Sequence, residues 1–207
     1  MGPQVYGYRM SSFAYQEWIG ARRARIDELF SAHTTVGGSR PGRRWQTEQL
    51  NWSLTFRLAG EFQGFTRELH DQAVDCCANS IAGTNPTLAN VARTSMSSNR
   101  QLDRGNASPS ALGNDFSRFG LLLWPALKTA DRRADKWNSE LETLNVARNA
   151  IAHDDQRNFL QLGNAGKFPI TLTIVRTWRR ALDSLAATMD DVVGDYLGTL
   201  LGGPRPW

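Results

Sequence analysis

The fold class of this chain is decided by residues 54–76, LTFRLAGEFQGFTRELHDQAVDC. Apolar side chains recur there at intervals of three or four residues, which is the period of an α-helix. They are Leu54, Leu58, Phe62, Phe65, Leu69, Ala73 and Cys76. We expect one long helix from about residue 44 to residue 80. Gly60 and Gly64 lie inside it at a cost to helix stability, and we expect them to permit close approach of a neighbouring helix.

Helical periodicity continues on both sides of this segment, and no period-2 strand pattern of useful length is present. Further helices are expected at about 12–30, 86–99 and 131–152, and from residue 171 onward. An apolar run within 115–127 contains Pro125, which kinks or ends a helix. Flexible loops are expected near 31–43, 100–114 and 154–170, and the tail at 202–207, GGPRPW, cannot continue a helix. The sequence therefore predicts a single all-α domain over residues 1–207, a bundle of about five to six helices.

The composition is that of an ordinary globular protein with a mild positive charge. The chain has 207 residues and a formal net charge of +4, and 21 of its 24 basic residues are arginine because only three are lysine. Arginine suits phosphate better than lysine does, although a GC-rich coding sequence would also explain the bias. Cys76 and Cys77 are adjacent and provide no disulfide framework. No apolar run of membrane-spanning length and no secretion signal is recognisable, so we expect a cytoplasmic protein.

The segment LNVARNAIAHDD, residues 144–155, carries the strongest chemical signal. Arg148 lies on the apolar stripe of its helix, between Leu144 and Ile151. A guanidinium on the core side is costly unless it meets a counter-charge or an anionic ligand. Asn149 and His153 are four residues apart, so they share a helix face and can hydrogen-bond.

An arginine followed by four residues and a histidine at a helix end resembles the signature of the HEPN superfamily. The chain is most similar to the RiboL-PSP type of HEPN domain, and the resemblance covers most of its length. It includes the upstream helix with GEFQGFTREL, the helix with Arg148, a loop and a closing amphipathic helix. Many members of the superfamily are metal-independent ribonucleases in toxin–antitoxin, antiphage or CRISPR systems. The resemblance implies that Arg148, Asn149 and His153 are catalytic and that no cofactor or metal is needed.

The expected reaction is attack of a ribose 2′-OH on its own phosphodiester, giving a 2′,3′-cyclic phosphate and a 5′-OH end. Histidine titrates near neutrality and can transfer the protons, while arginine stabilises the charge on the phosphoryl group. Arg148 and His153 are separated by about 140° on an ideal helix, so one chain presents them poorly to one phosphate. HEPN nucleases solve this with a twofold dimer, so we expect a homodimer that acts on RNA. Any antitoxin or regulatory protein would be a separate chain.

One position departs from the pattern of the related domains. These often carry a glutamate in an aromatic–Glu–Gly–aromatic stretch, whereas this chain has Gln63 between Phe62 and Gly64. Glu61 lies two residues earlier and points about 160° away on an ideal helix, so it is not a simple substitute. Gln63, Glu61 and Asp154 are nevertheless candidates for supporting roles, with Asp154 orienting His153.

Other interpretations stay open. Arg148 and His153 could form a helix-ending ion-pair cluster with Asp154 and Asp155. The whole chain could be a catalytically inactive HEPN module that dimerises and binds RNA or protein, or less plausibly a helical DNA-binding regulator. His70 is expected to be a surface or interhelix residue, and the three histidines lack the spacing of a zinc site. Basic side chains that could contact an RNA backbone, or only face solvent, are Arg22, Arg23, Arg25, Arg43, Arg44, Arg132 and Arg133.

Overall fold

The computed structural model describes residues 10–37 and 45–207, and every regular element within these ranges is helical. In chain order the elements are α1 (Phe13–Glu17), the π-helical turn η1 (Trp18–Arg22), α2 (Arg23–Gly37), α3 (Trp45–Ala82), α4 (Pro86–Ser97), α5 (Gln101–Arg104), α6 (Pro109–Phe116), the 3-10 turn η2 (Ser117–Phe119), α7 (Leu123–Ala130), α8 (Ala134–His153), α9 (Gln156–Asn164) and α10 (Leu172–Leu201). The predicted all-α fold class is confirmed.

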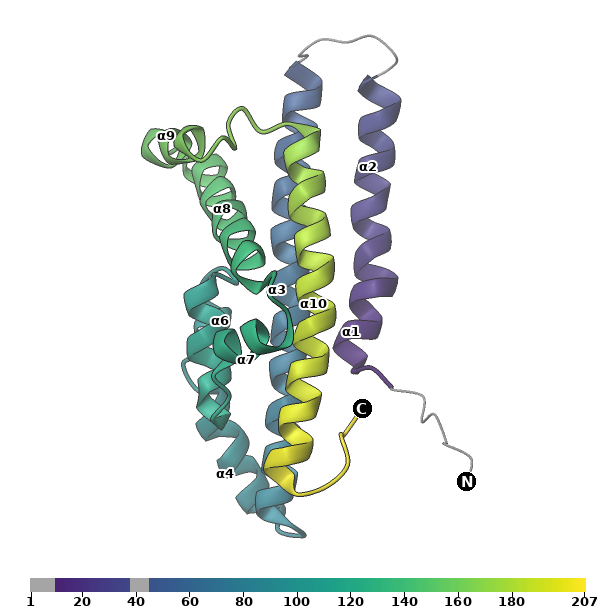
Figure 1. The fold of residues 1–207 in the computed structure, drawn as a ribbon, viewed down its shortest axis with the longest axis vertical. Helices are drawn as coiled ribbons and strands as arrows, with labels where there is room; N and C mark the ends of the chain where they lie inside the picture. Colours follow the sequence, from purple (N-terminus) through teal and green to yellow (C-terminus); the bar gives the residue numbers. More distant parts are fainter. Residues whose placement is uncertain (1–9, 38–44) are drawn as a thin grey trace.

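The long helix α3 forms the axis of the bundle, as its apolar stripe predicts. It packs against α2, α4, α8 and α10. Figure 1 shows α3 and α10 side by side along the long axis of the molecule, with α2 on one side and α8 on the other. Within the described ranges, neither α3 nor any other helix has the length and apolar character needed to cross a membrane.

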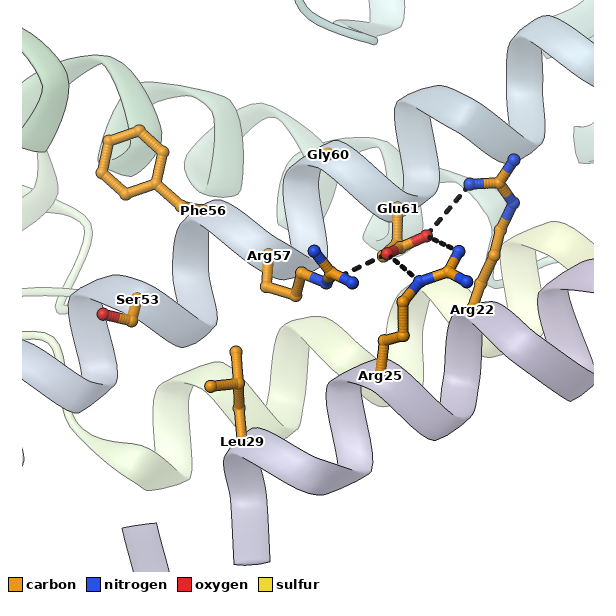
Figure 2. Close-up of a pocket in the computed structure, with 8 residues that line it drawn as sticks. All are labelled: Arg22, Arg25, Leu29, Ser53, Phe56, Arg57, Gly60 and Glu61. Atoms are coloured by element: carbon orange, nitrogen blue, oxygen red, sulfur yellow. Dashed lines mark hydrogen bonds and ion pairs between the residues drawn. The ribbon is translucent and has the colours of Figure 1, made fainter. Parts of the chain in front are cut away.

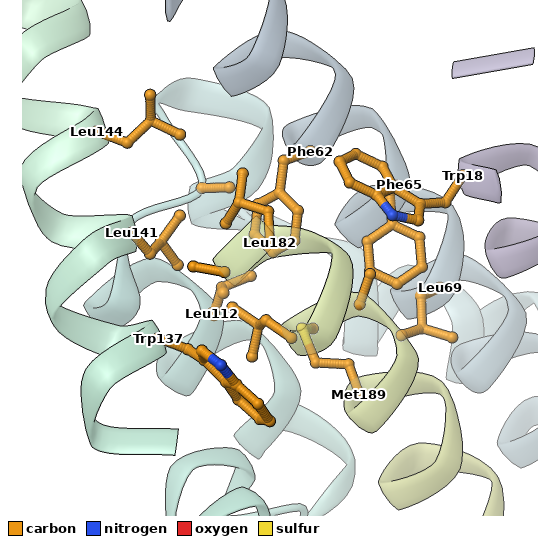
Figure 3. Packing of buried hydrophobic residues seen from close by; sticks show 14 of the residues in the cluster. Trp18, Phe62, Phe65, Leu69, Leu112, Trp137, Leu141, Leu144, Leu182 and Met189 are labelled. Carbon is orange, nitrogen blue, oxygen red and sulfur yellow. The ribbon is translucent and has the colours of Figure 1, made fainter. Parts of the chain in front are cut away.

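The core lies where α3 meets α8, α10 and the N-terminal turn η1 (Figure 3). The buried ring of Trp18 lies 5.7 Å, centre to centre, from both Phe62 and Phe65 of α3. Leu141 of α8 and Leu182 of α10 are buried in the same cluster. Burial of such large apolar side chains contributes about 1.5–3 kcal/mol each, so this contact fixes the four elements relative to one another.

The N-terminal segment differs from the single helix expected at 12–30. Ser12 caps α1, and its hydroxyl accepts a hydrogen bond from the backbone N–H of Tyr15. A π-helical turn then separates α1 from α2 and ends at Arg22. Such turns re-aim the side chains that follow them and often occur at functional sites. α2 extends to Gly37, into the expected loop at 31–43, and residues 38–43 lie outside the described part of the chain.

Two segments expected to be loops contain helices. Residues 100–114 include α5 and most of α6, and residues 154–170 include α9. The described residues therefore hold ten α-helices rather than about five to six. The helices α6 and α9 begin at local caps, Ser108 and Asp155, whose side-chain oxygens accept backbone N–H bonds. Arg100 before α5 makes no such side-chain cap.

Both ends of the described chain contact α10 at Asp190. The carboxylate of Asp190 accepts a hydrogen bond from the backbone N–H of Ser12 (3.1 Å). After Gly202 ends α10 in a left-handed conformation, the tail turns back, and the Arg205 guanidinium donates to the backbone carbonyl of Asp190 (3.1 Å) and lies 3.5 Å from its carboxylate. Burial raises the pKa of Asp190, and the Ser12 hydrogen bond and the charge of Arg205 oppose this rise.

Candidate functional site

The motif residues lie at the C-terminal end of α8, as expected. Leu144 is buried in the core, while the side chains of Arg148 and Asn149 are half-buried at the edge of the bundle. His153 is the last residue of α8 and is exposed. Asp154 adopts a left-handed conformation (φ 48°) and ends the helix, which separates α8 from α9.

The Arg148 guanidinium contacts an amide and an aromatic ring of the described residues. One terminal nitrogen donates to the side-chain oxygen of Asn149 (3.2 Å), and the guanidinium carbon lies 5.8 Å from the centre of the Phe56 ring. Among the described residues, no Asp or Glu forms an ion pair with Arg148. A half-buried guanidinium held by an amide and an aromatic ring retains attraction for an anion.

Asn149 is held by a residue that sequence analysis did not identify. Its side-chain oxygen accepts a second hydrogen bond from the amide of Asn106 (2.7 Å). In the described part of the chain, Asn149 makes no hydrogen bond with His153, although the two share a helix face. Asn106 precedes α6, 43 residues before Asn149. Helical spacing relates only residues close in sequence, so no local pattern could have revealed this contact.

His153 has no hydrogen bond or ion pair with any described residue. Asp154 accepts only a long hydrogen bond from the Gln156 amide (3.4 Å), and Asp155 accepts one from the backbone N–H of Arg157 (2.9 Å). The ion-pair cluster considered from the sequence is therefore not formed. The imidazole is exposed, and no contact among the described residues shows Asp154 orienting it.

Gln63 is connected to this site through the segment that carries Asn106. Its side-chain amide donates to the backbone carbonyls of Leu102 (2.8 Å) and Gly105 (2.6 Å). The Asn145 amide donates to the Ala107 carbonyl (3.1 Å) and fixes the other side of Asn106. Gln63 does not contact the motif arginine, so it can act on the site only by positioning.

Glu61 lies on the α2 side of α3, away from Gln63, as helix geometry predicts. Its carboxylate accepts hydrogen bonds from Arg22 (3.0 Å) and Arg25 (2.7 and 2.8 Å) and pairs with Arg57 (3.0 Å) (Figure 2). Burial tends to raise the pKa of Glu61, but the hydrogen bonds from Arg25 and Arg22 outweigh this, so its pKa is lowered. No contact joins Glu61 to Arg148.

The remaining candidate arginines are dispersed. Arg23 pairs with Asp183 (3.0 Å), and Arg133 pairs with Asp131 (2.7 Å). Arg132 is exposed, and Arg43 and Arg44 lie outside the described residues. These side chains do not extend the site at α8.

His70 is fully buried between α3 and the segment of α5 and α6. Its Nε2 lies 3.0 Å from the Asp115 carbonyl oxygen, and its Nδ1 lies 3.1 Å from a terminal nitrogen of Arg100. Arg100 also pairs with Asp71 and Asp103. Burial lowers the pKa of His70, and the charge of Arg100 lowers it further. Of the two positions expected for His70, surface or interhelix, the structure shows the interhelix one.

The chemistry available at the end of α8 is that of an unpaired guanidinium and an accessible imidazole. In the described ranges, no group of three or more His, Cys, Asp or Glu side chains is arranged to hold a metal ion. Comparisons with protein-family models, curated proteins and solved structures found no match for this chain. The site geometry and the motif are therefore the basis for a functional proposal.

Proposed function

We propose that this protein is a metal-independent endoribonuclease of the HEPN type, with Arg148, Asn149 and His153 as its catalytic residues. The supporting observation is the half-buried guanidinium of Arg148, which has no carboxylate partner among the described residues, on the same helix end as an exposed, unpartnered His153. A structural arginine in such a position ordinarily has a counter-charge. A phosphate group would supply one.

In the proposed reaction, one imidazole takes the proton of the ribose 2′-OH while the oxygen attacks phosphorus. The bond from phosphorus to the 5′-oxygen breaks, and a protonated imidazole gives its proton to that oxygen. Arg148 donates hydrogen bonds to the phosphoryl oxygens and stabilises their negative charge. Asn149, fixed by Asn106, keeps the Arg148 side chain in place.

We propose a homodimer because one copy does not bring the two groups together. Apolar surface next to the site supports this arrangement. Leu160 of α9 is 70% exposed, and Phe168 is 42% exposed. Together with Asp154 they line one open pocket beside the end of α8. A second copy covering this surface would place its own Arg148 and His153 nearby.

The activity is tested with purified protein and single-stranded RNA in EDTA. Wild-type protein is expected to produce 2′,3′-cyclic phosphate and 5′-OH ends, while Arg148→Ala and His153→Ala reduce the rate by at least about 100-fold. Lys136→Ala, near the opposite, N-terminal end of the same helix, is the matched control. Cleavage that disappears on chelation, or that persists in His153→Ala, would contradict the proposal. Binding without cleavage in every variant would favour the inactive module.

The dimer is tested by Leu160→Lys. The exposed position tolerates lysine in a monomer, so the fold should survive while self-association and RNA cleavage are lost together. Val91→Lys, at a 61% exposed position of α4, makes the same change elsewhere and should preserve both. Light scattering gives the molecular mass. A monomeric Leu160→Lys protein with full activity would exclude the shared site.

A role as a toxin or antiphage effector follows from RNA cleavage within a host cell. Expression of the wild-type chain in a bacterial host is expected to stop growth, and His153→Ala should relieve this effect. Equal growth inhibition by both proteins at equal expression would argue against an effector that acts by RNA cleavage.

A further inference from the structure

A second basic site lies between α2 and α3. It is an open pocket of about 710 Å³, within the usual size of ligand sites. The lining residues that matter are Arg22, Arg25, Phe56, Arg57, Gly60 and Glu61. Figure 2 shows arginines from both helices reaching the carboxylate of Glu61.

The pocket lining carries more positive than negative charge. Three guanidiniums surround one carboxylate, which accepts from Arg22 and Arg25 and pairs with Arg57. Arg22 is also held by Glu68 outside the pocket (2.7 Å). Arg22 is therefore largely neutralised, whereas Arg25 and Arg57 share a single carboxylate between them.

Arg25 and Arg57 retain donors for a further anion. Arg25 uses its Nε and one terminal nitrogen on Glu61, and the Nε of Arg57 lies 3.0 Å from a Glu61 carboxylate oxygen. Their side chains are 39% and 41% exposed and line the open pocket, so both guanidiniums are accessible to a ligand there. Glu61 thus orients both guanidinium groups without occupying all of their N–H donors. Guanidinium groups bind phosphate well, because they can donate two parallel hydrogen bonds to it.

Gly60 keeps the middle of the pocket open. A Cβ atom built on Gly60 would meet nothing within 4 Å, so the expected close helix approach does not occur there. At Gly64 a Cβ atom would clash with the Arg22 guanidinium, which crosses α3 at that point. The two glycines therefore serve the basic cluster in different ways. Gly64 leaves room for the Arg22 guanidinium, and Gly60 leaves open space in the pocket.

Phe56 joins this pocket to the site on α8. Its ring is 37% exposed at the pocket edge, and the Arg148 guanidinium lies 5.8 Å from its centre. Exposed aromatic rings beside basic grooves serve as stacking platforms for single-stranded bases. Phe56 thus lines the pocket and also contacts Arg148.

We infer that the pocket of Arg25, Arg57 and Gly60 binds a phosphodiester of single-stranded RNA, with an adjoining base on Phe56 and the strand continuing to Arg148. RNA as the ligand rests on the proposed function. A free mononucleotide would offer the same phosphate and base chemistry, so the test includes both sources.

The test measures binding rather than cleavage, with His153→Ala protein and a fluorescent 12-nucleotide RNA. Adding Arg25→Gln and Arg57→Gln is expected to weaken binding about tenfold or more at low salt. The slope of log affinity against log salt should also fall by roughly 0.7 for each lost phosphate contact. The control pair Arg93→Gln and Arg104→Gln removes the same charge from a half-buried position of α4 and an exposed position of α5, and it should change neither value strongly.

A second variant blocks the pocket without removing charge. Gly60→Leu fills the open space, and leucine favours a helix more than glycine does, so the protein should remain folded. We expect RNA to bind more weakly, while the contacts that remain give an unchanged slope of log affinity against log salt. Gly20→Leu, at another exposed helical glycine with open space around it, should bind normally.

The outcomes separate this inference from the proposed nuclease. Specific loss of RNA binding in the pocket variants supports the pocket even if wild-type protein cuts no RNA. Equal losses in the pocket and control pairs overturn it even if wild-type protein is an active nuclease. AMP that binds the wild-type pocket without displacing the RNA, or RNA binding unaffected by Gly60→Leu, also overturns it.

Discussion

The surroundings of His70 and Arg100 and the end of α8 with Arg148 and His153 each combine an arginine with a histidine, and they differ in how the polar atoms of these residues are used. In the first, Arg100 and His70 lie 3.1 Å apart in the interior beside α3. In the second, Arg148 and His153 lie on α8 without contacting each other. Sequence alone offers the same two residue types in both places.

Neighbouring residues supply hydrogen-bond and ion-pair partners to Arg100 and His70. Arg100 is 5% exposed and pairs with Asp71 and Asp103, and both nitrogens of His70 have partners. Buried polar groups with every partner in place stabilise a particular packing. This pair has little capacity left for a ligand.

Arg148 and His153 on α8 have hydrogen-bonding groups that no described residue occupies. Arg148 has an amide and an aromatic ring for partners, and His153 has no partner among the described residues. The comparison teaches that unused charge and hydrogen-bonding capacity, rather than residue type, distinguishes a candidate site from a structural cluster. The predictions below test this distinction.

The largest effect on stability is expected from Arg100→Ala. Removing the guanidinium leaves His70 and the segment around α5 without their central partner, at a cost of about 3 kcal/mol in the free energy of unfolding. Arg148→Ala should cost about 1 kcal/mol or less, because it loses only an amide bond and a cation–π contact. Urea unfolding followed by tryptophan fluorescence measures both. If both variants lose the same free energy of unfolding, Arg148 is also a structural residue.

A smaller effect is expected from Gln63→Glu, which replaces the side-chain amide on α3 with a carboxylate of nearly the same shape. The Gln63 amide donates to the Leu102 and Gly105 carbonyls, and a carboxylate cannot donate to either. We expect a loss of about 2 kcal/mol.

The matched control is Gln72→Glu, which makes the same charge change on α3 at a half-buried position with no hydrogen bond to the described residues. It should change stability by less than about 0.5 kcal/mol. If Gln63→Glu is instead neutral or stabilising, Gln63 does not hold the segment that carries Asn106.

The fold could be predicted where the determining signals are local. The stripe on α3, Pro86 at the start of α4 and Thr171 before α10 all act within a few residues. The helix α5 could not be predicted, because its N-terminal backbone N–H groups at Gln101 and Leu102 are satisfied by the distant carboxylate of Asp115. Its sequence carries no sign of that partner.

The candidate site also has features that the sequence could predict and features that it could not. Arg148 and His153 belong to one helix, so their spacing could be recognised from the sequence. The contribution of Asn106, the ring of Phe56 beside Arg148 and the convergence of Arg57 on Glu61 depend on how helices pack. Short-range periodicity does not encode such contacts between distant segments.

The smallest expected effect concerns pH and again contrasts the two histidines. Because burial and then Arg100 lower the pKa of His70, the unfolded state, with a histidine pKa near about 6.5, binds the proton more readily than the folded state. The stabilisation from neutral His70 is therefore complete above about pH 6.5 and is lost as the pH falls toward the lower folded pKa.

Urea unfolding between pH 7.5 and pH 5 should show wild-type stability falling, with a shallower fall in His70→Asn. Carboxylates titrate in both proteins, so the difference between the two profiles isolates the buried imidazole. His153→Asn, which changes an exposed side chain with no partner among the described residues, should keep the wild-type profile. A His70→Asn profile parallel to wild type would show that the buried histidine is protonated as easily in the folded chain as in the unfolded one. Burial and Arg100 would then not keep His70 neutral.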